Sequence, residues 1–389
     1  VGSEMCIRDR NKLAEVFGDP AALRAESSTM PGSRLILLLV TAFVLGCATQ
    51  APVDAPQQIL VPVYYATDRN LLPNEDNESG FYGDGRGDIR FGSTLVALST
   101  RKQGDSPFAD WSRWEARRDR SRNRNELLAV NPLDTQTFAA TLDTAFLGDS
   151  DRSVLLFVHG FRRSFEIVAT EVATIAFEIN LHGAPMFFSW PSANSSLAYA
   201  SDVNSMRWAA ADLRDTLKFL LARESIATVH VIAHSLGSDG LLMALEDLSR
   251  DDAARVDKLG EIVLASPDVD AGMFQRDYLP ALQKLGARAT LYATDNDVPL
   301  RASGRVNRYH RLGNAKAEIF IGDGIQTIVY TDVVTFMNSH DAVVEIGDVQ
   351  ADLHYLLVER LGADERPTLM GVDTDRGRYW RAQSLTDRP

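Results

Sequence analysis

Short apolar runs alternate with helical stretches along most of this 389-residue chain. The clearest run, VLLFV at residues 154–158, is apolar at every position, as expected for a strand that is buried on both faces. Residues 212–222 instead carry leucines at helical spacing, which predicts an amphipathic helix. This alternation predicts an α/β fold with a mostly parallel central sheet and helices on both of its faces. The expected strands are residues 59–66, 89–98, 154–158, 186–189, 229–233, 262–265, 289–293 and 327–334.

The chain before residue 47 is not expected to belong to this sheet. Residues 1–29 begin with VGSEMCIRDR, which resembles translated sequencing adaptor and suggests a non-native leader. Met30 is a better start, because an apolar stretch at 35–44 follows it that is too short to span a bilayer but suits a signal peptide. The stretch leads into Leu-Gly-Cys47, which resembles the lipobox of bacterial lipoproteins. Residues 30–46 are therefore predicted to be a lipoprotein signal peptide and Cys47 the lipidated residue; the alternative is an ordinary signal peptide with a chance cysteine.

These features divide the rest of the chain. Residues 47–58 contain prolines and little apolar content, so they are predicted to be a tether. The folded domain is expected over residues 59–363, and residues 364–389 are expected to form a polar C-terminal tail. A lipid on Cys47 would hold the protein in the bacterial cell envelope. Since Ala48 rather than Asp follows the cysteine, the expected position is the periplasmic side of the outer membrane.

Charge and cysteine content limit the partners. The formal net charge of −13 argues against nucleic acid as a partner. Residues 113–124 are the exception, with six arginines and two acids; such a run is either a solvated face or a contact with an anionic surface such as lipid head groups. The two cysteines, Cys6 and Cys47, leave no pair for an intramolecular disulfide after the predicted cleavage. No histidine pair at ligand spacing and no CxxC motif is present, so neither a metal nor another cofactor is predicted.

The sequence VHVIAHSLGSDG at residues 229–240 carries the strongest chemical signal. An apolar strand ends at Ser235, and a predicted helix at 241–248 follows. Ala233 and Gly237 flank the serine at two residues on either side, where the tight turn of a nucleophile elbow needs small residues. Ser235 is therefore the candidate nucleophile, although a strand that ends in a serine-containing turn would give the same pattern.

A second motif, FVHGF at residues 157–161, follows an earlier buried strand. A tetrahedral intermediate needs two backbone N–H donors, one from such a loop and one from the residue after the nucleophile. These donors would be Phe161 and Leu236, and Gly160 would let the backbone approach the substrate without a Cβ. Residues 189–202, which include Trp190, follow another strand and are expected to form one wall of the site.

The acid and the base are expected after later strands. Asp297 follows the strand at 289–293 and is the predicted acid; Asp295 would point differently, and Asp268 and Asp270 remain alternatives after the preceding strand. Their other role would be to cap the helix that begins near Met273. His340 follows the last strand and is the predicted base, which gives the chain order Ser, Asp, His.

The remaining histidines have other expected places. His159 belongs to the His-Gly loop and is expected to be structural, although it also borders the pocket. His234 sits beside the nucleophile and is expected to line the pocket with His159, Gly160 and Trp190. His354 falls in the last predicted helix, where a packing or surface role is expected.

Taken together, FVHGF, SWPS, AHSLG, ASPDVD and YATDNDVPL resemble the bacterial α/β-hydrolase proteins of esterase/lipase-like type and mostly unassigned substrate. The resemblance runs from about residue 60 to about residue 360 and includes the VYYATDRN and GDIRFGS segments. Ala233 in place of the usual glycine and the arginine-rich residues 113–124 depart from the pattern. The resemblance implies an α/β-hydrolase fold and hydrolysis of an ester-like bond.

A serine hydrolase, and specifically a carboxylesterase with an acyl-enzyme intermediate, is therefore the predicted function. Only 23 residues separate Ser266 from Thr290, so no large cap domain is expected, which favours a small-molecule ester of short or medium length. The alternatives are an amidase, a peptidase or an acyltransferase on the same fold, or a non-catalytic envelope module that binds without reacting.

Overall fold

The computed structural model describes residues 57–73, 81–100, 125–146, 151–195, 197–251, 255–333 and 340–384. The predicted leader at 1–29, the signal peptide at 30–46, Cys47 and the arginine-rich residues 113–124 lie outside the described residues. The predicted tether does so too, apart from Gln57 and Gln58, which belong to the first strand.

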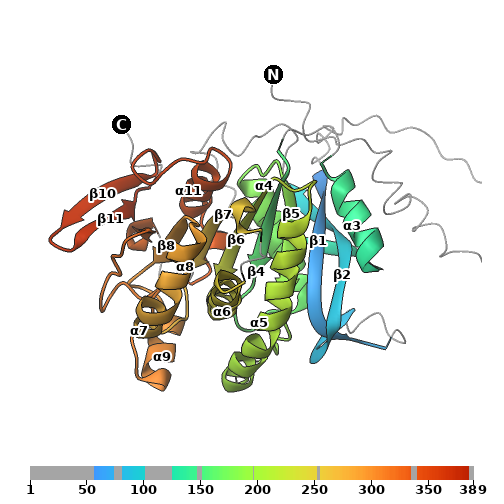
Figure 1. The fold of residues 1–389 in the computed structure, drawn as a ribbon, viewed down its shortest axis with the longest axis horizontal. Helices are drawn as coiled ribbons and strands as arrows, with labels where there is room; N and C mark the ends of the chain where they lie inside the picture. Colours follow the sequence, from blue (N-terminus) through green and yellow to red (C-terminus); the bar gives the residue numbers. More distant parts are fainter. Residues whose placement is uncertain are drawn as a thin grey trace, which may run out of the picture.

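The described strands form one 11-stranded sheet in the order β10-β11-β9-β8-β7-β6-β4-β5-β1-β2-β3 (Figure 1). The eight strands from β11 to β1 in this order are parallel to their neighbours, whereas the outer pairs β1–β2, β2–β3 and β10–β11 are antiparallel. The bounds are β1 Gln57–Leu71, β2 Tyr82–Thr100, β3 Glu126–Leu133, β4 Ser153–Val158, β5 Ala184–Ser189, β6 Thr228–His234, β7 Leu259–Ala265, β8 Ala289–Ala293, β9 Ile325–Val329, β10 Leu369–Thr374 and β11 Gly377–Ala382.

Helices cover both faces of this sheet. One core cluster joins the sheet to α3, α5, α6 and α8, and a second joins the other face to α4, α10 and α11. Strands β4 and β8 are buried at every residue, because each is covered on both faces. The helical elements are α3 Thr135–Thr144, α4 Phe165–Glu178, α5 Tyr199–Ala222, α6 Gly237–Ser249, η3 Val256–Lys258, α7 Ala271–Met273, η4 Phe274–Tyr278, α8 Leu279–Leu285, α9 Val298–Asn307, η5 Thr331–Val333, α10 Ala342–Glu345 and α11 Gly347–Leu357.

This architecture confirms the predicted α/β class with a mostly parallel sheet. Between β7 and β8 the chain forms only α7, η4 and α8, so this part of the described chain contains no large cap domain. Because parallel strands end at one edge, the loops after β4, β5, β6, β7 and β8 meet at the lower edge of the sheet in Figure 1. Among the described helices, none has the length and apolar content needed to cross a membrane.

The structure differs from the predictions at the C-terminal end. The strand predicted at residues 327–334 is β9, Ile325–Val329, and η5 follows it after one residue. The predicted polar tail contributes the hairpin of β10 and β11, which extends the sheet through pairing of β11 with β9. The folded part therefore continues past the predicted boundary at residue 363, with Trp380 of β11 buried in the second core cluster.

Candidate active site

Ser235 lies on the sharp turn between β6 and α6. Its backbone has φ of 53°, a left-handed conformation that costs energy for any residue with a Cβ. The turn is held from both sides, because Ser235 N–H donates to Ala265 O at 2.9 Å and Ser235 O accepts from Asp268 N–H at 3.1 Å. The strand–turn–helix context predicted for this serine is therefore present.

Two glycines let the neighbouring loops approach this turn. A Cβ on Gly160 would lie 2.9 Å from Ser235 Cβ and 3.0 Å from His234 Nδ1. A Cβ on Gly237 would lie 2.4 Å from His159 O, which is backbone and cannot move aside easily. The glycines of the HGF and SLG segments are thus required by close packing of the two loops against each other.

The structure brings Ser235, His340 and Asp297 together in one hydrogen-bonded chain. His340 Nε2 lies 3.0 Å from Ser235 Oγ, within hydrogen-bond distance for accepting the hydroxyl proton. On the other side of the ring, His340 Nδ1–H donates to Asp297 Oδ2 at 2.7 Å. The aspartate therefore selects the tautomer whose Nε2 is an acceptor toward the serine.

Asp297 is fixed by a second contact. Its other oxygen, Oδ1, accepts from Leu300 N–H at 2.8 Å and caps the N-terminus of α9. The side chain is fully buried, so the cap and the imidazole together determine its orientation. One carboxylate thus both begins α9 and positions His340.

The two alternative aspartates have other partners. Asp268 Oδ2 accepts from Tyr199 OH at 2.8 Å, and its Oδ1 forms an ion pair with Arg311 Nε at 3.1 Å. Asp270 caps α7 through Met273 N–H at 3.0 Å, the capping role considered for it from the sequence. Among the described residues, only Asp297 has a carboxylate hydrogen-bonded to His340.

Phe161 and Leu236 both lie beside the serine turn. Leu236 directly follows Ser235 and stands at the N-cap of α6, where the helix dipole is positive. Neither the Phe161 N–H nor the Leu236 N–H donates a hydrogen bond to another described residue. Such unused donors are what a developing oxyanion requires, and most buried N–H groups are paired.

His159 and Trp190 support the loop from behind. Their rings stack at 4.9 Å between centroids with an interplanar angle of 6°. His159 Nε2 accepts from Trp190 N–H at 3.1 Å, and its Nδ1–H donates to Gly160 O at 2.8 Å. Burial, together with the charge of Arg69, holds the pKa of His159 well below its usual value, so the ring is neutral. Both side chains are fully buried, so they brace the loop rather than line an open pocket wall.

Tyr199, the first residue of α5, belongs to the segment 189–202 that is predicted to form one wall of the site. Its ring packs edge-on against Phe161 at 5.6 Å, and its hydroxyl reaches Asp268. This places α5 against the loop that follows β4.

His340 is held in place by residues that the sequence did not indicate as a group. His234 Nε2–H donates to the backbone O of His340 at 2.8 Å, so the histidine beside the serine supports the backbone of His340. The next residue, Asp341, accepts from Arg163 Nη2 at 2.5 Å, and Arg163 Nε also binds Glu171 at 2.7 Å. Because Arg163 follows Phe161 by two residues, this ion pair ties the His340 segment to the loop after β4.

The electrostatic environment separates the two neighbouring histidines. Burial, followed by the nearby His340, lowers the pKa of His234 to about 4, so His234 stays neutral at neutral pH. Burial acts in the same direction on His340, but the charge and hydrogen bond of Asp297, with smaller contributions from Asp341 and Asp268, outweigh it and raise the pKa of His340 above 6.5. A raised pKa means that this ring accepts a proton readily, as a general base must.

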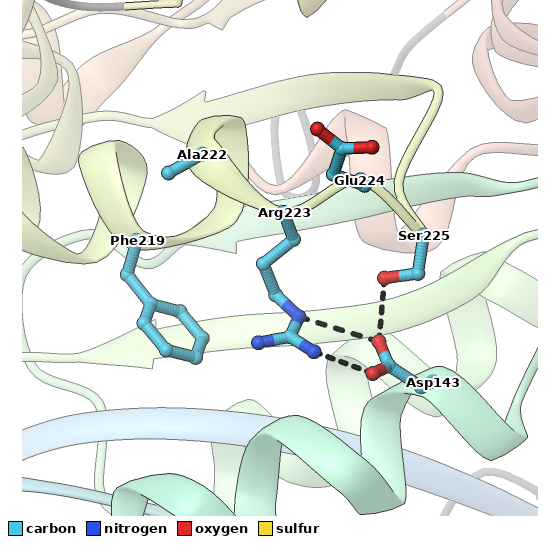
Figure 2. Close-up of a pocket in the computed structure, with 6 residues that line it drawn as sticks. All are labelled: Asp143, Phe219, Ala222, Arg223, Glu224 and Ser225. Carbon is cyan, nitrogen blue, oxygen red and sulfur yellow. Dashed lines mark hydrogen bonds and ion pairs between the residues drawn. The ribbon is translucent and has the colours of Figure 1, made fainter.

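A cavity of about 470 Å³ lies away from these residues, at the far end of α5 (Figure 2). The 24 residues of α5 span about 36 Å, and Tyr199 stands at the other end. Three polar side chains of this cavity bind one another: Arg223 Nη2 lies 2.5 Å from Asp143 Oδ2, and Ser225 Oγ–H donates to Asp143 Oδ1 at 2.5 Å. They link α3 to the end of α5.

No group of three or more metal-ligating side chains within the described ranges is arranged to hold a metal ion.

Strand order, the serine turn and the Ser-Asp-His order along the chain define an α/β-hydrolase fold. Residues 134–328, half of the chain, match the family described as "Alpha/beta hydrolase of unknown function (DUF900)", and the protein belongs to this family. The matched span includes Ser235 and Asp297 and ends before His340.

Solved structures provide a more distant comparison. An esterase from Pyrobaculum calidifontis is 13% identical with a TM-score of 0.32, over 59% of this chain and 94% of that one. The lin2722 gene product of Listeria innocua is 13% identical with a TM-score of 0.32, over 56% and 97%. An arylesterase is 14% identical with a TM-score of 0.25, over 52% and 76%. None of the curated proteins matches the chain.

Proposed function

We propose that this α/β hydrolase is a serine carboxylesterase that acts through Ser235, His340 and Asp297. The observation that carries the proposal is the continuous hydrogen-bonded chain from Ser235 Oγ through His340 to Asp297, with links of 3.0 and 2.7 Å. A serine hydroxyl alone is a weak nucleophile at neutral pH, and an adjacent, oriented base is the arrangement that activates it. The substrate proposed is a carboxylic ester of short or medium acyl length.

In the first half-reaction, Ser235 Oγ attacks the ester carbonyl while its proton passes to His340 Nε2. The carbonyl oxygen becomes negative and is stabilised by the N–H groups of Phe161 and Leu236, each of which contributes about 3 kcal/mol in comparable sites. Asp297 stabilises the imidazolium formed on His340. When the tetrahedral intermediate collapses, the alkoxide leaves and takes the proton from His340, which leaves the acyl group on Ser235.

The second half-reaction repeats these steps with water. His340 takes a proton from the water, the hydroxide oxygen bonds to the acyl carbon, and the bond to Ser235 Oγ breaks. The serine oxygen recovers its proton from His340, and the carboxylic acid is released. No step needs a group beyond the residues named and water.

A fluorophosphonate probe tests the proposal directly. We expect the folded protein to be labelled on Ser235, because phosphorus bonds to an activated serine oxygen as fluoride leaves. Peptide mass spectrometry locates the label, and heat-unfolded protein is the control that should not react. Absence of label on the folded protein, or a label on another serine, would contradict the proposed nucleophile and favour a module that only binds.

The pH dependence tests the base. Since only neutral His340 accepts the serine proton, kcat/KM should rise with pH along a limb whose midpoint lies above 6.5. Asp341→Asn removes a negative charge that raises the pKa of His340, so the midpoint should move to lower pH. Asp332→Asn, which removes an exposed carboxylate bound to Arg381, is the matched control. A loss of kcat in Asp341→Asn with an unmoved midpoint would assign Asp341 a structural role only.

We also propose that the protein is held in the bacterial cell envelope by a lipid on Cys47. The support is the apolar stretch at 35–44 followed by Leu-Gly-Cys47. Intact mass spectrometry of the mature protein should find an N-terminus at Cys47 carrying acyl chains, and Cys47→Ser should abolish this modification. An unmodified N-terminus at another residue would exclude the anchor.

A further inference from the structure

Helix α9 connects directly to the proposed catalytic residues, because it begins one residue after Asp297. Its inward face is fixed by polar contacts. Ser303 Oγ–H donates to Asp268 at 2.5 Å and lies 2.9 Å from Tyr199 OH. Asn307, one turn later, donates to the same tyrosine hydroxyl at 3.4 Å. These bonds hold α9 against the start of α5.

Large apolar side chains are exposed at the end of α9 and just after it. Val306 is 73% exposed and Tyr309 is 68% exposed. Together with Leu197, just before α5, they are the three most exposed large hydrophobic side chains of the described chain. The start of α5 follows β5 and α9 follows β8, so these segments lie at the carboxyl edge of the parallel strands, the edge at which Ser235 follows β6 (Figure 1). Val306 and Tyr309, three residues apart and both largely exposed, give the end of α9 an apolar surface that a partner can cover.

The same segment is strongly basic. Residues 298–317 contain four arginines, one lysine and no acid, within a chain of net charge −13. The flanking acids are occupied, because Asp297 binds His340 and Glu318 pairs with Arg376. Arg305 and Arg308 are exposed and form no ion pair with any residue that the structure describes. We call the group Arg305, Val306, Arg308 and Tyr309 the α9 tip.

We propose that the α9 tip docks on an anionic lipid surface and that the esters hydrolysed at Ser235 are presented there. Guanidinium groups bind lipid phosphates, while Val306 and Tyr309 enter the boundary between head groups and acyl chains. A small soluble anion would leave the two apolar side chains in water, and an apolar pocket would leave the arginines without counter-ions. An anionic lipid surface provides phosphates for the two arginines and an apolar boundary for Val306 and Tyr309. The substrate class, an amphiphilic ester, rests on the proposed esterase function.

Position in the fold links docking to the active site. Figure 1 shows α9 and the start of α5 at the lower edge of the sheet, the edge at which Ser235 follows β6, so docking at the α9 tip and the reaction at Ser235 fall on one side of the molecule. The first strand begins at the opposite edge, since β1 is parallel to β5 and Gln57 is its first residue. Binding through the tip is therefore separable from binding through a lipid at Cys47.

The test measures binding of the full chain to vesicles in a Cys47→Ser background, so that the N-terminal segment contributes equally to every variant. The parent should bind phosphatidylglycerol vesicles more tightly than phosphatidylcholine vesicles, and added salt should weaken the binding. Arg305→Gln/Arg308→Gln and Val306→Ser/Tyr309→Ser should each weaken binding to the anionic vesicles by about tenfold. Turnover of a water-soluble short-chain ester should stay unchanged, while turnover of a vesicle-borne ester should fall.

Matched controls come from positions outside the α9 tip. Arg152→Gln/Lys284→Gln removes the same charge at the opposite edge of the sheet, ahead of β4 and β8, and Met370→Ser removes an exposed apolar side chain of β10, the outermost strand. Equal losses of vesicle affinity in the tip and control variants would show that net charge alone matters and would overturn the proposal. Tip variants that bind vesicles as tightly as the parent would overturn it too, as would a parent protein that binds no vesicle. A parent that binds vesicles but hydrolyses no ester would instead count against the proposed esterase function.

Discussion

Ser235→Ala should abolish ester hydrolysis while the protein remains folded. The change removes one oxygen and keeps the Cβ, so the packing of Gly160 against this turn is preserved. Without Oγ no acyl-enzyme forms, and His340 has no nucleophile to activate. The loss in kcat should be on the order of 10⁶-fold, as for removal of the nucleophile in other serine hydrolases, with residual turnover from the oxyanion donors and binding alone. Steady-state kinetics on a short-chain ester measures this loss.

Ser238→Ala is the matched control for this variant. Ser238 lies three residues further on and is also buried, and its hydroxyl donates to Ala233 O at 3.0 Å rather than to His340. Its removal should cost about 1 kcal/mol of stability and leave kcat within a few-fold. A folded Ser235→Ala protein that hydrolyses the ester at the parent rate would refute the nucleophile.

Local sequence signals were sufficient to predict the site residues that follow the ends of strands. The predicted strand at 289–293 coincides with β8, and Asp297 follows it by four residues. In a parallel sheet, strand ends meet at one edge, so correct strands and their order place the following loops close together. This is why Ser235, Asp297 and His340, separated by 62 and 43 residues, could be proposed as a group from the sequence.

Strand ends depend on partners that local composition does not reveal. Residues 327–334 are rich in β-branched side chains, which favours a strand. In the structure, however, β9 stops at Val329, paired with Ala293, where its neighbour β8 also ends. The hairpin of β10 and β11, in contrast, consists of two strands that the sequence did not indicate. It lies at the sheet edge with most of β10 exposed, so its polar sequence gives no alternating apolar pattern.

Contacts between distant segments could not be predicted at all. Arg163 and Asp341 are 178 residues apart, and nothing in the local sequence of either indicates its partner. The double role of Asp297 was also missed, because capping was considered only for Asp268 and Asp270. An aspartate before Val-Pro at the start of a helix is nevertheless a capping pattern, so this signal was present in the sequence.

Asp297→Asn should lower kcat by about 10⁴-fold with little change in KM. The carboxylate acts on the imidazolium that forms in the transition state, and substrate binding does not require it. Asparagine can still accept the Leu300 N–H bond at the start of α9, because it is a good N-cap residue. Its amide could, however, donate to His340 Nδ1, which would favour the tautomer with a proton on Nε2 and block acceptance from Ser235.

Asp295→Asn and Asp268→Asn separate this effect from a general loss of charge near the site. Asp295 lies two residues away and forms no hydrogen bond with His340 in the described structure, so its variant should keep near-parental kcat. Asp268→Asn weakens the ion pair with Arg311 and should mainly lower the melting temperature. Kinetics should be compared at temperatures equally far below each variant's melting point, so that unfolding is not read as lost catalysis. If Asp268→Asn lost activity by orders of magnitude while Asp297→Asn stayed near the parent, the acid would follow β7 instead of β8.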